Sequence, residues 1–192
     1  ISRFCVKFKK KVRKNKIIIC VPNTLIYPFT KKVRPNVVSI GAQNCHHYPS
    51  YGAYTGSVNA LMLRKIGAEY IILGHSENRF KGESISLIKK KIENSLNQKL
   101  NVIFCIGETL KEKNQKKTFS VLRKQIKGSI EKKFNFNKII IAYEPVWSIG
   151  TGLIQKSNEL LDTINFIKKK NKNIKVLCGG SVNPKNINEL KS

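Results

Sequence analysis

The chain has 192 residues, 41% of them hydrophobic, and its 37 lysine and arginine residues outnumber 11 acidic residues, which gives a formal net charge of +26. That length suits one domain with a substantial core. No apolar run approaches the roughly 18 residues that a bilayer-spanning helix needs, so we expect no membrane segment.

A basic excess of this size is typical of proteins that bind nucleic acids. The lysines are nevertheless spread along the outer faces of the expected helices, and the chain is equally rich in isoleucine and asparagine. We therefore favour a solvated basic surface, with no nucleic-acid partner, over a dedicated nucleic-acid footprint. A long-range attraction for small anionic substrates is compatible with both interpretations.

The five cysteines show no CxxC or histidine-paired spacing that would hold a metal; they are Cys5, Cys20, Cys45, Cys105 and Cys178. Their odd number and their scatter along the chain fit buried thiols in a reducing compartment. We expect a cytoplasmic protein without a metal site.

The chain opens with a helical pattern over residues 1–14, so we expect the numbering to begin within a longer sequence. Short β-branched runs without clean alternation then predict parallel strands covered on both faces, at residues 16–20, 37–41, 70–74, 101–107, 138–143 and 174–178. Between the strands, helical periodicity predicts helices at residues 57–66, 84–98, 118–134 and 157–170.

Two of the predicted helices have a readable apolar stripe, which we interpret as the face that packs on the sheet. In residues 57–66 the stripe consists of Val58, Leu61, Met62 and Ile66. In residues 84–98 it consists of Ile85, Ile88, Ile92 and Leu96.

Alternation of strand and helix predicts a parallel α/β sheet, either doubly wound or closed into a (β/α)8 barrel. Polar residues follow five strands in succession: Gln43-Asn44, His75, Glu108, Glu144 and Ser181. A barrel assembles its site from all the βα loops at one mouth, whereas an open sheet concentrates it at one crevice, so we favour the barrel. We expect a single partial TIM-barrel domain over residues 1–192 that contains strands two to seven of the usual eight.

Glu144 ends an apolar strand and precedes the stretch PVWSIGTG, residues 145–152. A carboxylate at this place is partly desolvated, which suits a catalytic base. A stiff Pro-Val-Trp step before a glycine-rich tip describes a lid that closes over an anion. A glutamate paired with a neighbouring lysine, beside a routine glycine turn, explains the same residues equally well.

His75 follows Gly74 at a strand end, and Ser76-Glu77 is typical of a first helical turn. A helix N-terminus disfavours imidazolium, so His75 would stay neutral and donate a hydrogen bond, although a histidine that only caps the helix is the commoner case. In CGGSV, residues 178–182, the glycines allow close approach of a ligand to the backbone and Ser181 can donate to a phosphate. A plain tight turn is an equally good explanation of that motif.

Together, six motifs resemble the triosephosphate isomerase family in order and spacing over essentially the whole chain: GAQN (41–44), GAYTG (52–56), GHSENR (74–79), CIGET (105–109), AYEPVWSIGTG (142–152) and CGGSV (178–182). YEPVWSIGTG with an upstream GHSE is highly specific to that family. The resemblance implies a TIM barrel and an isomerase of glycolysis and gluconeogenesis. It would interconvert dihydroxyacetone phosphate and D-glyceraldehyde 3-phosphate without a cofactor.

The resemblance also implies roles for individual residues. Glu144 would be the base that moves a proton between C1 and C2 through an enediolate, and His75 the neutral electrophile at the carbonyl, roles for which this family is itself the standard worked example. Ser76 would hold Glu144 when the lid is open, and Glu77 would orient a catalytic lysine. The phosphate would be bound by Gly150, Gly180 and Ser181, while the lid shields the enediolate from water.

The sequence departs from the family pattern at both ends. The family's first strand carries an Asn-x-Lys pair that has no counterpart before Ile1, and its eighth strand, with a second Gly-Gly pair, would lie beyond Ser192. Losing one preorganised electrostatic donor typically costs on the order of 100- to 1000-fold in rate. We therefore expect the chain alone to be inactive and poorly stable, with two unpaired sheet edges.

Two further departures concern assembly and the lid. Ser57 and Asn78 stand where the family commonly has a Glu and an Arg that pair across a dimer interface. Both partners are replaced together, so we still expect the full-length protein to form a homodimer through residues 45–56. Cys178 stands where the family usually has a tyrosine that bonds the closed lid, which suggests a less populated closed lid and more phosphate loss from the intermediate.

Two alternatives remain at this point. Other phosphate-binding barrels, such as those acting on indole-glycerol phosphate or ribose phosphates, share the Gly-Gly-Ser pattern but lack GHSE paired with YEPVW. A nucleic-acid-binding barrel is the alternative from a different class, and a salt titration of binding would separate it from mere surface charge.

Overall fold

The computed structural model describes residues 16–33, 37–169 and 171–190. The helix expected over residues 1–14, together with Cys5, lies outside the described residues. The chain divides into two compact units. One comprises the residues up to Leu73 together with Leu87–Ile103, and the other comprises Gly74–Ser86 together with the residues from Phe104 onward.

The strands in the described part of the chain are β1 (Ile17–Val21), β2 (Val38–Ala42), β3 (Tyr70–Leu73), β4 (Asn101–Ile106), β5 (Ile139–Tyr143) and β6 (Lys175–Cys178). Each lies within one residue of its predicted bounds at both ends. Hydrogen-bonded neighbours follow chain order from β1 to β6. A doubly wound sheet would reverse direction at one point, so this order confirms the predicted succession of (β/α) barrel steps.

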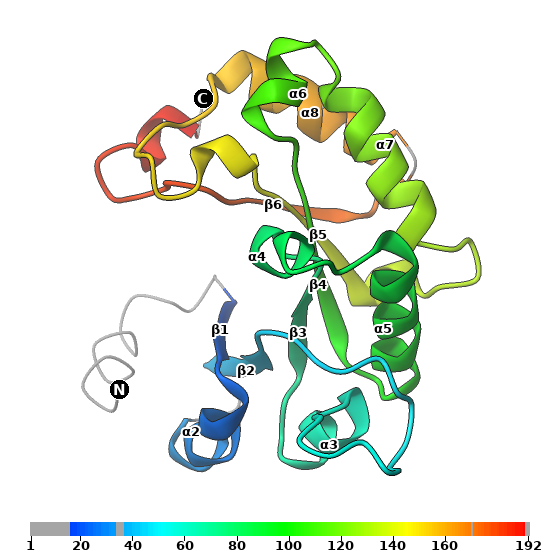
Figure 1. Cartoon of the computed structure of the whole chain (residues 1–192). Helices are drawn as coiled ribbons and strands as arrows, with labels where there is room; N and C mark the ends of the chain where they lie inside the picture. The colour runs from blue at the N-terminus through cyan, green and yellow to red at the C-terminus, as the bar shows by residue number, and fades with distance from the viewer. Residues whose placement is uncertain (1–15, 34–36, 170, 191–192) are drawn as a thin grey trace. The chain divides into compact units, whose positions relative to one another are not determined.

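The helices are labelled in Figure 1 and comprise α2 (Ile26–Lys32), α3 (Ala60–Lys65), α4 (Ser76–Phe80), α5 (Ile85–Asn97), α6 (Leu110–Asn114), α7 (Thr118–Ser129) and α8 (Ser157–Lys168). Periodicity predicted α3, α5, α7 and α8, and the first turn of α4 was expected after His75. The short helices α2 and α6 were not predicted, because five to seven residues are too few to display a helical period.

Helix α3 begins later than its pattern predicts. Asn59 is its N-cap, and the Asn59 side chain accepts a hydrogen bond from the backbone N–H of Met62 at 3.0 Å. The buried residues of α3 are Ala60 and Leu63. The predicted stripe is therefore wrong for this helix: Val58, Leu61, Met62 and Ile66 are only half-buried. The buried face of α3 includes Ala60, and a search for large apolar residues overlooks an alanine.

The stripe predicted for α5 is confirmed at its centre, where Ile88 and Ile92 are fully buried. Helix α7 ends at Ser129 instead of residue 134, because Ile130 adopts an extended backbone conformation. Ile130 and Phe134 are nevertheless buried, so apolar residues beyond the helix had extended the apparent period.

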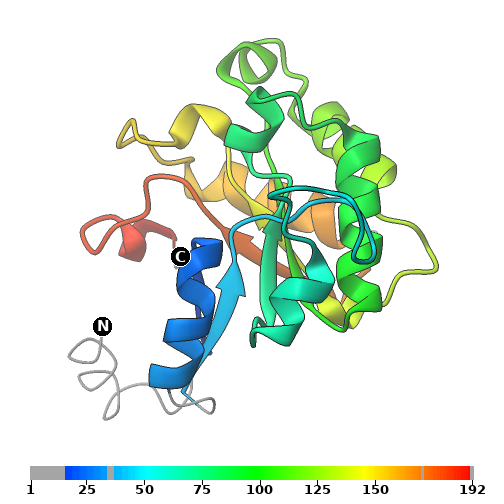
Figure 2. The ribbon, with the colours of Figure 1, turned by 60° about the horizontal axis from the view of Figure 1, so that its bottom comes forward.

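In the unit that contains β1 and β2, the two strands pair in parallel from Ile17 opposite Val38 to Val21 opposite Ala42. All residues of β2 are buried, and α2 lies alongside this strand (Figure 2). A side chain at Gly41 would come within 2.6 Å of Cys20 Sγ, so glycine is required for this close packing. Burial raises the pKa of the Cys20 thiol to about 11.

The expectation of buried thiols is confirmed only in part. Cys45 and Cys105 are buried and Cys20 is half-buried, but Cys178 is exposed. Cys178 is the last residue of β6, a strand in which Lys175 and Leu177 are exposed as well.

The loop between β2 and α3 is ordered by its own aromatic residues. The Tyr48 and Tyr54 rings stack with centroids 3.4 Å apart, and the His46 ring lies 4.6 Å from that of Tyr48. The ends of the loop are joined by a hydrogen bond from the His46 N–H to the Val58 carbonyl at 2.7 Å. We call residues 45–58 the aromatic loop.

In the other unit, β5 and β6 pair in parallel from Ile140 opposite Lys175 to Tyr143 opposite Cys178. The loop after β5 and the turn after β6 therefore leave the sheet at the same edge, as the yellow and orange-red segments of Figure 1 show. This carboxyl end of the strands carries most of the residues that the sequence analysis identified as candidates for the site.

Candidate active site

His75 and Glu144 face each other. His75 precedes α4 and Glu144 directly follows β5, and His75 Nε2 lies 3.3 Å from Glu144 Oε2. The two side chains are 25% and 21% exposed, so both are partly desolvated yet reachable from solvent. An acid-base pair with this geometry can exchange a proton with a small bound molecule.

The other ring nitrogen of His75 fixes the position of the proton. His75 is the N-cap of α4, and its Nδ1 accepts a hydrogen bond from the Glu77 N–H at 3.4 Å. Nδ1 must then be unprotonated, so the neutral imidazole carries its hydrogen on Nε2. The N–H of the neutral ring is thereby directed toward the Glu144 carboxylate.

The pKa of His75 is raised above its ordinary value. The hydrogen bond with Glu144 is the main cause; burial opposes it, and the negative charges of Glu144 and Glu77 add to the increase. The sequence suggested that the helix N-terminus would favour the neutral ring, but α4 has only five residues and the nearby carboxylates have the larger effect.

Two glycines make room for Glu144. A side chain at Gly107 would collide with the Glu144 carbonyl oxygen, and the Glu144 N–H donates to the Ile106 carbonyl at 2.8 Å. A side chain at Gly179 would approach the Glu144 carboxyl group to 3.3 Å. Glu144 thus lies between two neighbouring backbones, and at Gly107 only glycine allows so close an approach.

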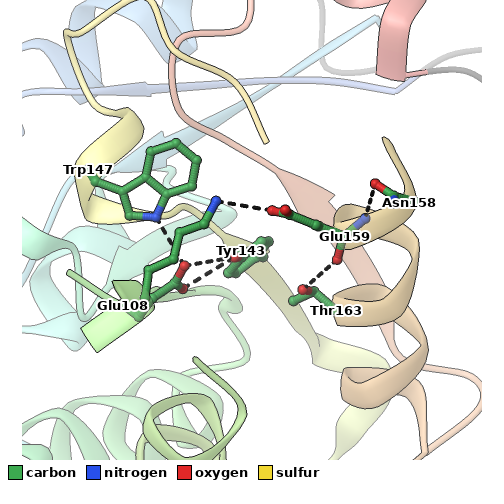
Figure 3. Close-up of polar contacts among 7 residues, drawn as sticks. Glu108, Tyr143, Trp147, Asn158, Glu159 and Thr163 are labelled. Carbon is green, nitrogen blue, oxygen red and sulfur yellow. Dashed lines mark hydrogen bonds and ion pairs between the residues drawn. The ribbon is translucent and has the colours of Figure 1, made fainter. Parts of the chain in front are cut away.

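Glu108 anchors the loop that follows Glu144 (Figure 3). Its side chain is completely buried, and its carboxylate accepts hydrogen bonds from Tyr143 Oη at 3.2 Å and from Trp147 Nε1 at 3.0 Å. Burial raises the pKa of Glu108, while these hydrogen bonds oppose the rise. The sequence placed Glu108 at a strand end but gave it no role; its buried donors come from β5 and from the loop.

The loop itself, residues 145–152, begins with a 3₁₀ turn (Val146–Ser148) and has two glycines near its end. Gly150 and Gly152 have φ angles of +70° and +77°, a region that favours glycine. Thr151 Oγ1 donates to the Trp147 carbonyl at 3.1 Å. The loop therefore has a 3₁₀ turn at its base and left-handed glycines at its tip, and the stiffness of that base stays a prediction.

The turn after β6 binds this loop. Ser181 Oγ donates to the Ser148 carbonyl at 2.5 Å and accepts from the Gly152 N–H at 3.0 Å. The Ser181 N–H donates to Ser148 Oγ at 3.4 Å, a long bond. A side chain at Gly180, where φ is +105°, would collide with Ser148 Oγ. The structure thus brings Gly180 and Ser181 to the loop that contains Gly150, and Ser148 is a participant that the sequence reasoning missed.

Ser76 and Glu77 are less closely engaged. Ser76 and Glu144 line the same small pocket, with no hydrogen bond between their side chains in this structure. Glu77 is 76% exposed, and its carboxylate lies 4.0 Å from His75 Nδ1. Among the described residues, no lysine or arginine side chain bonds to His75 or Glu144.

Arg79 supports the turn that carries His75. Its guanidinium donates to the carbonyls of Gly74 at 2.7 Å and Cys105 at 3.1 Å. Gly74 has a φ of +72°, so these bonds stabilise a backbone conformation that glycine accommodates best. The motif GHSENR contains Arg79, but no spacing argument assigned it a role.

The other strand-end residues have local partners. Asn44 lies in the unit that contains β1 and β2, where its Oδ1 accepts from Lys91 Nζ at 3.1 Å. Gln43 Nε2 donates to the Cys20 carbonyl at 3.5 Å. Cys178 lines a pocket with Gln155, Tyr143 and Ser148, and its effect on the lid stays a prediction.

Within the described ranges, no group of three or more His, Cys, Asp or Glu side chains is arranged to hold a metal ion. In the same part of the chain, no helix is both long and apolar enough to cross a membrane.

Comparisons with known proteins agree on one family. A family profile described as triosephosphate isomerase matches residues 1–192. The chain is 37% identical to the triosephosphate isomerase of Dictyoglomus thermophilum over 97% of its own length and 80% of that protein. It is 40% identical to that of Aquifex aeolicus, over 96% and 78%. The crystal structure of triosephosphate isomerase from Bartonella henselae superposes with a TM-score of 0.85 at 34% identity, covering 98% of this chain and 81% of that one.

Proposed function

Because the chain belongs to the triosephosphate isomerase family, an enzyme family that interconverts triose phosphates, we propose that Glu144 and His75 carry out the proton transfers of this reaction. The observation that supports this most directly is the 3.3 Å separation of His75 Nε2 and Glu144 Oε2. A three-carbon substrate that replaced this contact would meet a carboxylate on one side and an N–H donor on the other.

In the proposed reaction, Glu144 removes a proton from C1 of dihydroxyacetone phosphate and returns it to C2. The C1–H electron pair becomes the double bond of the enediolate, and the charge that develops on the C2 oxygen is stabilised by the His75 Nε2–H. The hydroxyl proton on the C1 oxygen then passes to the C2 oxygen, so that reprotonation of C2 leaves a carbonyl at C1 and a hydroxyl at C2. The reverse reaction uses the same groups, and no redox partner is required.

The raised pKa of His75 is compatible with a neutral electrophile. Its main cause is the bond to ionised Glu144. Once Glu144 has taken up the substrate proton, it is neutral and no longer favours the imidazolium. His75 would then donate from Nε2 as a neutral ring while the enediolate exists.

The phosphate would bind to the N–H groups of Gly150 and Ser181, next to Gly180. The Ser181 N–H now faces Ser148 Oγ at 3.4 Å. A phosphate oxygen would be a stronger acceptor than this hydroxyl, because hydrogen bonds to an ionised acceptor are shorter and stronger. The loop from Pro145 to Gly152 would be the lid, and its bond to Ser181 would help to exclude water from the enediolate.

Ser76 and Glu77 are assigned supporting roles. Ser76 shares a pocket with Glu144, and we propose that it receives the Glu144 carboxylate when the lid is open. Glu77, which is 76% exposed, would be available to orient a lysine.

A further part of the proposal is that the 192-residue chain assayed by itself is essentially inactive; in the part of the chain that the structure describes, no lysine or arginine side chain bonds to His75 or Glu144. Within the described residues, the developing enediolate charge would meet only the His75 N–H. One missing electrostatic donor costs on the order of 100- to 1000-fold in rate. We also propose one barrel domain, a cytoplasmic location and a homodimer formed through residues 45–56 of the aromatic loop, which Tyr48 and Tyr54 hold in shape.

Isotope exchange tests these assignments even at very low turnover. Dihydroxyacetone phosphate incubated in D₂O with the purified chain should gain deuterium at C1 faster than in buffer, as measured by NMR. We expect Glu144→Gln to abolish this exchange and Lys175→Gln, an exposed change on β6, to leave it unchanged. Exchange that persists at the original rate in Glu144→Gln would exclude Glu144 as the base.

A further inference from the structure

Trp147 is held on two sides by side chains from different elements (Figure 3). Its indole N–H donates to Glu108 at 3.0 Å, as described above. The ammonium of Lys113, from α6, lies 4.0 Å from the centroid of the indole ring. Trp147 therefore meets a carboxylate at its edge and a cation at its face, an arrangement that suits the charge distribution of an aromatic ring.

The ammonium is itself held in place. Lys113 Nζ donates to Glu159 Oε2 at 3.0 Å, and Glu159 lies in the first turn of α8. The two side chains are 31% and 41% exposed, and an ion pair with this exposure contributes little to stability by itself. Its effect is to restrict the Lys113 ammonium to a position over the ring.

Helix α6 does not depend on Lys113 for its own structure. Thr109 and Glu112 form a capping box: Thr109 Oγ1 accepts from the Glu112 N–H, and the Glu112 carboxylate accepts from the Thr109 N–H at 2.8 Å. A substitution at Lys113 that preserves side-chain length should therefore leave α6 folded, and its effects should be confined to Trp147 and Glu159.

We propose that Lys113 is a positioning residue for the loop 145–152: its ammonium, held by Glu159, keeps Trp147 against Glu108 and favours the loop arrangement in which Gly152 binds Ser181. This inference rests on the proposed function, in which that loop is the lid. Trp147 lies in the first turn of the loop and Gly152 at its end, so a displaced indole would shift the whole segment.

The tryptophan provides a direct measurement, because the sequence contains one Trp. Lys113→Met keeps the aliphatic length and removes the charge, and Lys111→Met is the matched control, an exposed lysine of the same helix. We expect acrylamide to quench Trp147 fluorescence about two- to five-fold more efficiently in Lys113→Met, the range that corresponds to an exposed cation–π contact. Lys111→Met should match the parent chain, and Lys113→Arg should restore protection.

Glu159→Gln tests the other half of the contact. Glu159→Gln should raise quenching of Trp147 when Lys113 is present but should add little further quenching in Lys113→Met, because either change alone removes the ammonium from its position over the ring. Equal quenching in Lys113→Met and Lys111→Met, with circular dichroism unchanged, would overturn the proposal. So would a failure of Lys113→Arg to restore protection.

The affinity for inorganic phosphate tests this inference separately from the proposed function. If the loop is a lid over a phosphate site, phosphate should bind about two- to five-fold more weakly to Lys113→Met than to Lys111→Met, the factor again set by the lost cation–π contact. Equal phosphate affinities would overturn the link to the lid even if the quenching result holds. Loss of deuterium exchange in Glu144→Gln tests the chemistry independently of either result.

Discussion

Ser181 donates two hydrogen bonds to Ser148: Ser181 Oγ donates to the Ser148 carbonyl at 2.5 Å, and the Ser181 N–H donates to Ser148 Oγ at 3.4 Å. The residues are 33 positions apart in the chain, and each belongs to a different glycine-rich segment. The pair joins the loop after β5 to the turn after β6.

Ser148→Ala should loosen this junction. Ser148 is 2% exposed and its hydroxyl also donates to the Leu153 carbonyl at 2.6 Å, so the substitution leaves a carbonyl and an N–H without their partner. We expect a loss of about 1 kcal/mol in the free energy of unfolding by urea. Ser120→Ala, at an exposed hydroxyl on α7, should change stability by less than about 0.5 kcal/mol. Equal losses in both variants would contradict this account.

The charge of His75 should depend on Glu144. Because its pKa in the folded chain is above the ordinary value of 6.5, protonated His75 stabilises the fold below that pH, and this contribution is lost as the pH rises through the folded pKa. Imidazole NMR should show the pKa of His75 falling in Glu144→Gln. His47 is an internal reference, because burial together with His46, Lys90 and Lys91 lowers its pKa. A His75 titration that is unaffected by Glu144→Gln would contradict the cause assigned here.

Removing the Glu108 carboxylate should lower the free energy of unfolding. Glu108→Leu leaves the buried hydroxyl of Tyr143 and the N–H of Trp147 without an acceptor, and we expect a loss of about 2–4 kcal/mol on urea unfolding. Glu108→Gln retains one carbonyl oxygen and should lose less. If the two variants were equally stable, the hydrogen bonds would not be what Glu108 contributes.

The two glycines around Glu144 should differ in their effects. Gly107→Ala would drive a side chain into the Glu144 backbone, so we expect poor folding and loss of the cooperative thermal transition. Gly179→Ala meets only the Glu144 side chain at 3.3 Å, which can move aside. That variant should fold, with a lower His75 pKa because the carboxylate is displaced. Folding of Gly107→Ala with full stability would show that the strands can separate.

The sequence predicted the strands well because each is a short β-branched run whose ends are marked by a glycine or a polar residue. It predicted α3 less well, since its buried face is formed by Ala60 and Leu63, and alanine carries a weak hydrophobic signal. The end of α7 was misplaced because Ile130 and Phe134 are buried outside the helix and prolong the apolar period.

In the candidate site too, residues marked by a local sequence pattern could be predicted and residues that act through distant contacts could not. The strand-end positions of His75 and Glu144 marked both as candidates, because a parallel sheet collects its functional groups there, but the resemblance to the family supplied their roles. The roles of Ser148 and Lys113 could not be identified, since both depend on contacts between segments more than 30 residues apart in the chain. No local pattern encodes such contacts, and a single serine or lysine has no distinctive spacing.

The aromatic loop has a consequence for association. Tyr48, Tyr54 and His46 stack on one another within a single chain, and the His46–Val58 hydrogen bond closes the loop at its base. A segment braced in this way has already lost most of its conformational freedom on folding, so a partner that docks there needs to freeze few additional rotations. In the homodimer proposed above, truncating one ring should therefore weaken docking in two ways. It removes contact area, and it leaves the loop with more conformational entropy to lose on association.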